Sequence, residues 1–341
     1  MTFRLLSCDG GGIRGYISST LIARLNKDTG GKLLDNIDGY AGTSTGGLIS
    51  IALAAKVSID TMVSIYENDA GKIFTENSAY FARNAEKSRQ VAQLAQQPLA
   101  GPGIFECQYT ANGLHDTLLP YLGQTTFGDI TDKLLVINAA RLDNGDPAGG
   151  SWTPAYLNNC GIQADYSDIS LLNAALATSA APTYFPPHNI PGLGFFADGG
   201  TFANNPVLNG VLVALASGRA ATLSEIEVLS FGTGSTPVAI SEKAVGDPLS
   251  WGVTRWLWPT ASDGVPATPL LGMMFDLSAN NIADIAGIIP NGKMVRINPP
   301  LPAEVPLDGY SAQDYHYMQQ AIDAAINSSQ WQDAVALVNS W

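Results

Sequence analysis

Apolar residues in this chain gather in two kinds of segment, which indicate strands and helices. Short, nearly continuous apolar runs of strand length lie at residues 3–8, 36–41, 133–140, 195–197, 225–231 and 293–297. Longer segments, with helical spacing or small apolar residues, lie at residues 16–26, 47–55, 60–70, 79–97, 111–122, 171–180, 206–217, 311–328 and 331–338. Because strands and helices alternate up to about residue 235, the pattern predicts an α/β fold with a mainly parallel sheet and helices on both faces.

Residues 236–292 depart from this alternation, since they are rich in Trp, Met and Pro. Two interpretations fit this composition: a mobile apolar cover over a site for hydrophobic substrates, or a helical part of the packed core. We interpret residues 1–341 as a single domain with a motif-bearing core at residues 3–235. The apolar region follows this core, and residues 293–341 supply a closing strand and helices.

The charge balance restricts the partners of this chain. Its 30 acidic and 17 basic residues give a net charge of −13, and only 14% of its residues are charged. Nucleic acid is therefore excluded as a partner, because phosphate neutralisation requires clustered Lys and Arg. Strong electrostatic attachment to an anionic membrane is disfavoured too, whereas transient apolar contact with a membrane surface is not. The sequence does not predict an oligomeric state.

Cysteine and terminal sequences predict a cytoplasmic protein without a metal or other cofactor. The three cysteines are too few for a disulfide framework, and no Cys/His cluster has the spacing of metal ligands. The N-terminus lacks a basic region followed by an apolar core, so we expect no signal peptide. No uninterrupted apolar run reaches the roughly 18 residues of a membrane span.

The most informative motif is G-x-S-x-G at residues 42–46. It lies between a predicted strand and a predicted helix, which is the setting of an exposed nucleophile on a sharp turn. Glycine at positions 42 and 46 leaves room for that turn and for a substrate. Ser44 is therefore the candidate nucleophile, against the alternative of an ordinary Gly/Ser/Thr loop.

A second glycine-rich loop follows the first predicted strand and has two interpretations. Gly10, Gly12 and Gly15 match G-x-G-x-x-G, and Asp28 and Asp35 follow at about the spacing of a ribose-binding acid. This pattern favours a dinucleotide-binding protein. Consecutive glycines before a helix also direct backbone N–H groups toward one point, which suits the oxyanion of an ester being attacked.

A serine nucleophile requires a base, and the chain offers two arrangements. In the order serine, acid, histidine, His316 follows Asp198 and completes a triad with Ser44. However, His316 lies on a predicted surface helix, His188 follows two prolines in a predicted loop, and His115 adjoins an aspartate on a predicted helix. No recognisable catalytic motif surrounds any of them.

Asp198 offers the other arrangement, a two-residue dyad with Ser44. It ends an apolar strand and is followed by Gly199 and Gly200. Apolar surroundings limit the solvation of a carboxylate and raise its pKa toward that of a useful base. The alternative is an aspartate that begins a turn or caps the next helix.

Together these segments resemble the patatin-like phospholipases over residues 3–235. The matching blocks, in chain order, are DGGGIRG at 9–15, GTSTG at 42–46, ATSAAPTYFP at 177–186, DGG at 198–200, FANNP at 202–206 and SFGTG at 230–234. The resemblance implies a three-layer α/β/α sandwich and hydrolysis of fatty acyl esters of phospholipids or related lipids. It implies no cofactor.

The resemblance also implies roles for individual residues. Ser44 is the nucleophile and Asp198 its base, without histidine. Backbone N–H groups of Gly10, Gly11 and Gly12 form the oxyanion hole. The supporting residues are Arg14, Gly42, Gly46, Gly199 and Gly200.

Overall fold

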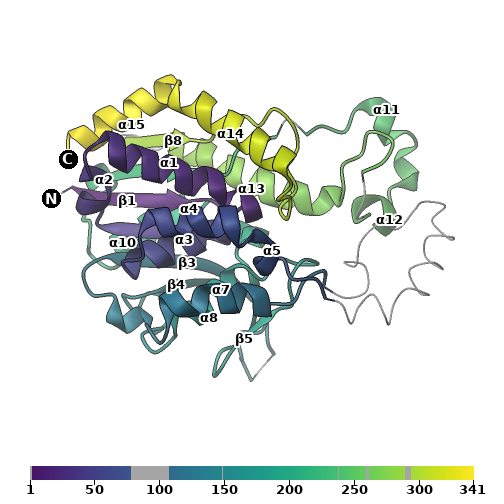
Figure 1. The fold of residues 1–341 in the computed structure, drawn as a ribbon. Coiled ribbons are helices and arrows are strands. Elements are labelled where there is room, and N and C mark those ends of the chain that lie inside the picture. The colour runs from purple at the N-terminus through teal and green to yellow at the C-terminus, as the bar shows by residue number, and fades with distance from the viewer. Residues whose placement is uncertain (1, 78–106, 148, 237, 259–260, 289–292) are drawn as a thin grey trace.

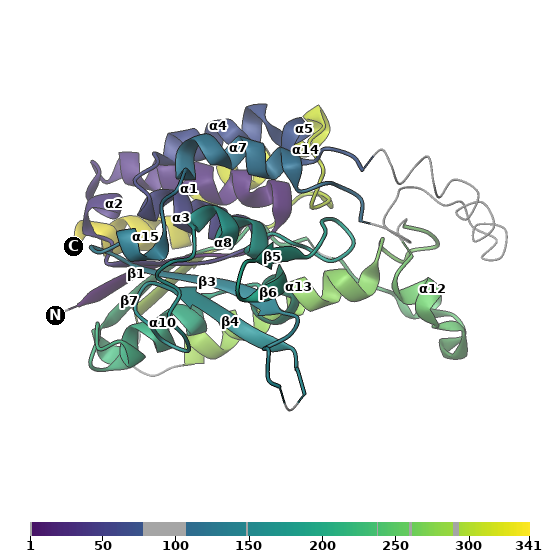
Figure 2. The same ribbon diagram turned by 90° about the horizontal axis from the view of Figure 1, so that it is seen from below.

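An eight-stranded sheet runs through the middle of the molecule, with helices against both of its faces (Figures 1 and 2). The computed structural model describes residues 2–77, 107–147, 149–236, 238–258, 261–288 and 293–341. The strand order is β5-β6-β3-β2-β1-β7-β8, and β4 pairs with β3. The three-layer α/β/α fold predicted from the sequence is confirmed.

The parallel and antiparallel strands occupy different parts of the sheet. The parallel strands are β1 (Phe3–Cys8), β2 (Gly39–Thr43), β3 (Leu134–Arg141), β7 (Ile226–Phe231) and β8 (Lys293–Ile297). The antiparallel strands are β4 (Thr153–Asn158), β5 (His188–Ile190) and β6 (Gly194–Asp198). The antiparallel strands thus extend the sheet beyond β3.

The larger helical layer covers one face of the sheet. Its main helices are α1 (Gly15–Asp28), α3 (Thr45–Ala54), α4 (Ile59–Asn68), α7 (Asn112–Leu122), α8 (Leu171–Thr178), α14 (Ala312–Ile326) and α15 (Ser329–Asn339). The opposite face carries α10 (Val207–Ala216) and α13 (Pro269–Ile288). The remaining short helices are α2 (Lys32–Asn36), α5 (Ala70–Ile73), α9 (Gly200–Ala203), α11 (Glu242–Val245) and α12 (Val253–Trp256), with 3-10 turns at Gly12–Arg14, Phe127–Asp129, Leu223–Glu225 and Pro248–Ser250.

The alternation of side chains along the strands divides the core in two. On β1, Leu6 and Cys8 belong to the large cluster under α1 and α3, whereas Phe3 and Leu5 belong to the cluster under α10. Successive residues of a strand point to opposite faces, so a strand that is apolar throughout must be covered on both sides. The apolar runs of the sequence therefore account directly for the three layers.

The structure shifts or adds several elements relative to the sequence prediction. The strand expected at residues 36–41 begins at Gly39, because Asn36 ends the unpredicted helix α2. Strands β4 and β5 were not predicted, and His188, expected in a loop, begins β5. The helix predicted at residues 79–97 lies outside the described residues.

The described part of the Trp-, Met- and Pro-rich region contains one long helix, α13, the two short helices α11 and α12, and the 3-10 turn at Pro248–Ser250. Helix α13 packs against α9 and α10, and its Phe275 and Ala279 are buried. Helices α11 and α12 lie beyond one end of the sheet (Figure 1). Within the described ranges, no helix has both the length and the apolar character needed to cross a membrane.

Candidate active site

Ser44 lies on a sharp turn between β2 and α3. Its backbone has φ 53° and ψ −127°, a conformation that a non-glycine residue adopts only when its surroundings impose it. The Ser44 N–H donates to Oγ1 of Thr178 at 2.9 Å, and this hydroxyl donates to the Asn138 carbonyl oxygen at 2.6 Å. Helix α8 and strand β3 therefore hold the turn that presents the serine side chain.

The glycines of the motif are required because the backbone is crowded at this turn. A Cβ atom on Gly42 would lie 2.4 Å from the Gly46 carbonyl oxygen. A Cβ on Gly46 would lie 2.0 Å from the Cys8 carbonyl oxygen at the end of β1. Glycine thus lets α3 begin directly against two parallel strands, as the sequence spacing predicts.

The strand register brings Asp198 to Ser44. Along β3, Asn138 pairs with Thr43 of β2, and the next residue, Ala139, pairs with Asp198 of β6. Strand β4 occupies the other edge of β3 over these positions. Strands β2 and β6 therefore meet end to end along one edge of β3, so that Ser44, which follows Thr43, adjoins Asp198.

Asp198 is a buried carboxyl group with one oxygen unpaired. Its side chain is 1% exposed, and Oδ1 accepts a hydrogen bond of 2.7 Å from the Gly200 N–H. Oδ2 is buried and makes no hydrogen bond of ordinary geometry with the described residues. Burial raises the pKa of Asp198 to about 7, although the Ser44 hydroxyl and the Gly200 N–H act to lower it. Such a carboxyl group can exchange a proton near neutral pH.

The turn after Asp198 packs tightly against its neighbours. A Cβ on Gly199 would lie 2.4 Å from the Asn138 carbonyl oxygen, and one on Gly200 would lie 2.4 Å from the Phe275 ring. The two glycines therefore allow β6 to end against β3 and α13, which fixes the position of the carboxylate.

The glycine loop places two residues with unengaged backbone donors beside Ser44. Gly11 and Gly12 line the same pocket as Ser44 and Asp198. Among the described residues, no acceptor takes a hydrogen bond from either N–H. Gly12 has φ 59°, and a Cβ there would lie 2.1 Å from the Leu307 carbonyl oxygen. Donors without an acceptor at the N-terminus of a helix suit a developing negative charge.

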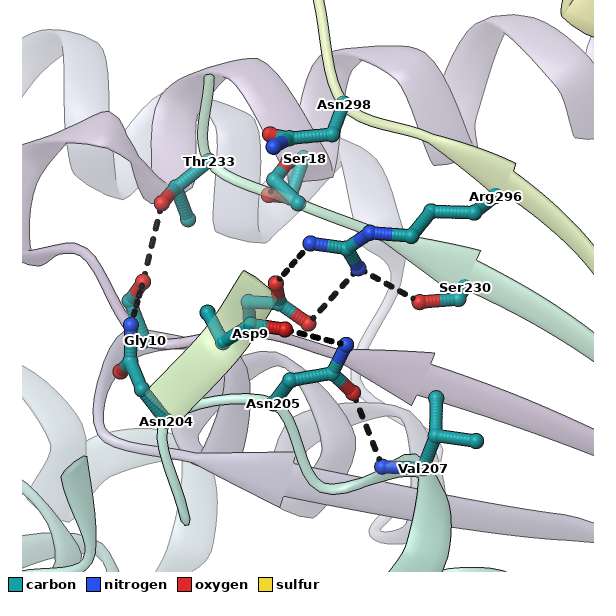
Figure 3. Close-up of polar contacts among 12 residues, drawn as sticks. Asp9, Gly10, Ser18, Asn204, Asn205, Val207, Ser230, Thr233, Arg296 and Asn298 are labelled. Carbon is teal, nitrogen blue, oxygen red and sulfur yellow. Dashed lines mark hydrogen bonds and ion pairs between the residues drawn. The ribbon is translucent and has the colours of Figure 1, made fainter. Parts of the chain in front are cut away.

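Gly10 has a different place from the one expected for an oxyanion donor. Its N–H donates to the Asn204 carbonyl oxygen at 3.0 Å. Its carbonyl oxygen accepts from Thr233 Oγ1 at 2.9 Å and from Asn204 Nδ2 at 3.3 Å (Figure 3). Gly10 therefore anchors the loop, and its N–H is already engaged.

Arg14 braces the glycine loop from within. The side chain is buried, and its Nε donates to the Gly11 carbonyl oxygen at 3.3 Å. Burial lowers the pKa of the guanidinium, while the negative charges of Asp276 and Glu304 oppose this shift. Because the Gly11 carbonyl and the Gly12 N–H belong to one planar peptide group, this hydrogen bond fixes the orientation of the Gly12 N–H.

A buried ion pair fixes the start of the loop. Asp9 accepts two hydrogen bonds from Arg296 of β8, at 2.6 and 3.2 Å, and Arg296 also donates to Ser230 Oγ at 2.8 Å (Figure 3). The two side chains are 3% and 14% exposed. Because the charges are shielded from water, each depends on the other for compensation.

Replacing Arg296 with Met is expected to lower the free energy of unfolding by about 3 kcal/mol, since Asp9 would stay buried without a partner. Urea denaturation measures this loss. The matched control is Arg24→Met on α1, since the side chains of Arg24 and its partner Asp28 are 49% and 28% exposed. Its loss should stay below about 1 kcal/mol. Equal losses in the two variants would contradict a structural role for the buried pair.

The loop geometry argues against the dinucleotide interpretation. The Ile13 N–H, which would face a pyrophosphate, donates instead to the Leu307 carbonyl oxygen at 2.7 Å. Asp28 ends α1 and pairs on the surface with Arg24, and Asp35 lies within α2. Neither acid follows a strand, where a ribose-binding residue belongs.

The three histidines of the chain lie outside the pocket that the described residues form at Ser44. His316 is exposed on α14. His188 contacts Asn173 Oδ1 through Nε2 at 3.0 Å, and His115 contacts Asp116 through Nδ1 at 2.8 Å. The triad with His316 therefore has no support in the geometry.

Replacing His316 with Ala is expected to leave kcat/KM for a short nitrophenyl ester within about twofold of the parent value, because the imidazole does not reach the pocket. The initial rate of nitrophenol release measures this. A loss of about 100-fold or more would restore histidine as the general base.

The pocket at Ser44 is lined by the candidate catalytic groups and by apolar side chains. The first set is Ser44, Asp198, Gly11 and Gly12. The apolar lining includes Leu48, Ile73, Phe74, Leu114, Phe185 and Phe275. The space is narrow, about 60 Å³. In the described ranges, no group of three or more His, Cys, Asp or Glu residues is arranged to hold a metal ion.

Several residues that hold the glycine loop were not identified from the sequence. Asn204 and Thr233 lie in blocks noted at 202–206 and 230–234, but their contacts with Gly10 depend on the fold. Arg296 and Leu307 come from the C-terminal part of the chain, where no motif marked them.

A comparison with protein families identifies the family of this chain. A family model described as patatin-like phospholipase matches residues 6–210. The chain belongs to the patatin-like phospholipase family. The matched range contains the glycine loop, the Ser44 turn and Asp198, whereas Thr233, Arg296 and Leu307 lie beyond it.

Curated relatives of this patatin-like protein come from bacteria and plants. The Vibrio cholerae protein named cGAMP-activated phospholipase is 33% identical over 243 residues, 67% of this chain and 64% of its own length. An Escherichia coli protein of the same name is 34% identical over 218 residues, 61% of this chain and 55% of its own. The chain therefore spans only 55–64% of the length of these two relatives. Patatin-like protein 4 of Arabidopsis thaliana is 28% identical over 305 residues, 82% of this chain and 70% of its own.

A solved structure of human GIVD cytosolic phospholipase A2 aligns with 99% of this chain and 60% of that one, with 11% identity and a TM-score of 0.42.

Proposed function

We propose that this patatin-like protein is a serine acyl-ester hydrolase that cleaves fatty acyl esters of phospholipids or related lipids. One observation carries the proposal. Ser44 on its strained turn, the buried Asp198 and the free N–H groups of Gly11 and Gly12 all line one apolar pocket. These are the nucleophile, the base and the oxyanion donors that acyl transfer requires.

The geometry suits a reaction in two steps. Asp198 accepts the Ser44 proton as Oγ attacks the ester carbonyl, and the negative oxygen accepts hydrogen bonds from the Gly11 and Gly12 N–H groups. When the carbonyl reforms, the C–O bond to the leaving alcohol breaks, and Asp198 returns the proton to that alcohol. Asp198 then takes a proton from water, which attacks the acyl-enzyme carbonyl. When the C–O bond to Ser44 Oγ breaks, Asp198 gives that proton to Oγ, so the fatty acid leaves and both residues return to their starting states.

The surroundings of the pocket support a lipid substrate. Its walls are aliphatic and aromatic, which favours a hydrocarbon chain over a polar acyl group. Leu249 and Val253, in the region before α13, are 95% and 75% exposed and offer apolar contact with a lipid surface. We infer a transient membrane-surface contact and a cytoplasmic location.

A fluorophosphonate probe tests the proposal directly, since it reacts with an activated serine. We expect mass spectrometry to find the label on Ser44. The same protein should release fatty acids from a panel of phospholipids, lysophospholipids, monoacylglycerols and short nitrophenyl esters. No label on Ser44 together with no ester hydrolysis would reject the function.

A further inference from the structure

A second, larger cavity adjoins the pocket at Ser44. It has a volume of about 780 Å³ and lies among the segment before α13, helix α13 and residues 304–307. Arg14, Tyr184, Phe275 and Leu307 line both cavities. The two spaces are therefore neighbours that share four lining residues.

The difference in volume matters for a lipid substrate. The pocket at Ser44, at about 60 Å³, has room for the reacting ester and the beginning of its chain. Small-molecule sites generally enclose about 300–1,000 Å³. The remainder of a lipid must therefore lie outside the narrow pocket, and the adjoining cavity has a suitable volume.

The lining of the larger cavity is mainly apolar. Its walls include Val245, Pro248, Trp251, Trp256, Leu271 and Met273. The cavity also contains Arg14, Asp276 and Glu304. Since the Arg14 guanidinium interacts electrostatically with both acids, these charges partly compensate one another. A hydrocarbon chain is thus a better match for most of this surface than a charged ligand.

We propose that the larger cavity binds the second acyl chain of a diacyl phospholipid, the chain that stays on the leaving group. This inference rests on the proposed function. The scissile chain is bonded directly to the carbonyl at Ser44 and so begins in the narrow pocket. The other chain is joined through the glycerol backbone, and it extends past the shared lining residues into the larger cavity.

Gly272 on α13 provides a test that fills the cavity. It lines the cavity, and a Cβ added there meets no described atom within 4 Å. Replacing Gly272 with Phe is expected to reduce kcat/KM on a long-chain diacyl phospholipid by roughly 10-fold or more, because the ring takes the space of the chain. Activity on a lysophospholipid with the same scissile chain should change less than about twofold.

Two matched variants control for the change of residue. Gly272→Ala adds only a methyl group at the same position and should behave as the parent on both lipids. Asn281→Phe adds the same ring on the exposed surface of α13, outside the cavity, and should also leave the ratio of the two rates unchanged. Both lipids are presented in nonionic-detergent micelles of one composition.

The outcomes separate this inference from the proposed function. A selective loss on the diacyl lipid in Gly272→Phe supports the second-chain site. Two results for Gly272→Phe would overturn it while leaving Ser44 chemistry intact. One is the parent's rate on both lipids. The other is the same fold-loss on both lipids with an unchanged thermal unfolding midpoint. Absence of hydrolysis of every ester by the parent protein would instead reject the proposed function.

Discussion

The Ser44→Ala variant is expected to hydrolyse a short nitrophenyl ester roughly 10⁴-fold more slowly than the parent, or slower still. Without the hydroxyl no acyl-enzyme can form, so Asp198 and the oxyanion donors are left to assist a water molecule. Such remnants of a hydrolase site support only a small part of its rate. The measurement is kcat/KM from nitrophenol release, together with loss of the fluorophosphonate label.

The fold should survive this substitution, because the conformation at φ 53° costs alanine about the same free energy as it costs serine. Ser50→Ala is a matched control on α3, the helix that follows Ser44, since Ser50 is buried and lies outside the pocket. It should keep nearly all activity. If Ser44→Ala kept more than about a tenth of the parent rate, Ser44 would not be the nucleophile.

The sequence predicts those parts of the site that local structure determines. Gly42, Ser44 and Gly46 need only a strand, a turn and a helix in succession, and the structure supplies β2, the turn and α3. Asp198 was a candidate because an apolar strand ends in an acid followed by two glycines, and the family resemblance favoured it over a turn or cap aspartate. In each case the residues that determine the geometry are close neighbours in the chain.

The remaining parts depend on contacts between distant segments. Gly10 was predicted to donate its N–H to an oxyanion. In the structure this N–H donates instead to the carbonyl oxygen of Asn204, which lies 194 residues further along the chain. Arg296 pairs with Asp9 across 287 residues, and only the order β1-β7-β8 brings them together. Hydrophobic periodicity carries no information about strand order, so these partners follow from the fold alone.

The Asp198→Asn variant is expected to lose roughly 10³-fold or more in kcat/KM, because an amide cannot accept the Ser44 proton. The change is nearly isosteric: the amide oxygen can still accept from the Gly200 N–H, as Oδ1 does at 2.7 Å.

The parent protein should show a pH profile that matches this role of Asp198. Since burial raises the pKa of Asp198 to about 7, kcat/KM should fall about tenfold per unit below that pH and level off above it.

The same pKa predicts the opposite effect on stability. Between its usual pKa of 3.8 and about 7 the folded protein retains a proton on Asp198 that the unfolded chain releases. The free energy of unfolding therefore falls as pH rises through this window. Asparagine is always neutral, so near pH 8 the inactive variant should be more stable than the parent, on the order of a few kcal/mol. Urea denaturation at about pH 5 and pH 8 measures this difference.

Asp116→Asn provides the comparison, because it makes the same change at a carboxylate that is 77% exposed and lies outside both cavities. On the short ester it should keep the parent's rate and pH profile. An Asp198→Asn protein that is both inactive and less stable at pH 8 would show only a damaged fold. We expect the variant to lose activity and gain stability. Ionising the buried Asp198 carboxyl group lowers the free energy of unfolding, yet the reaction needs the ionised form to accept a proton, so one substitution should produce both effects.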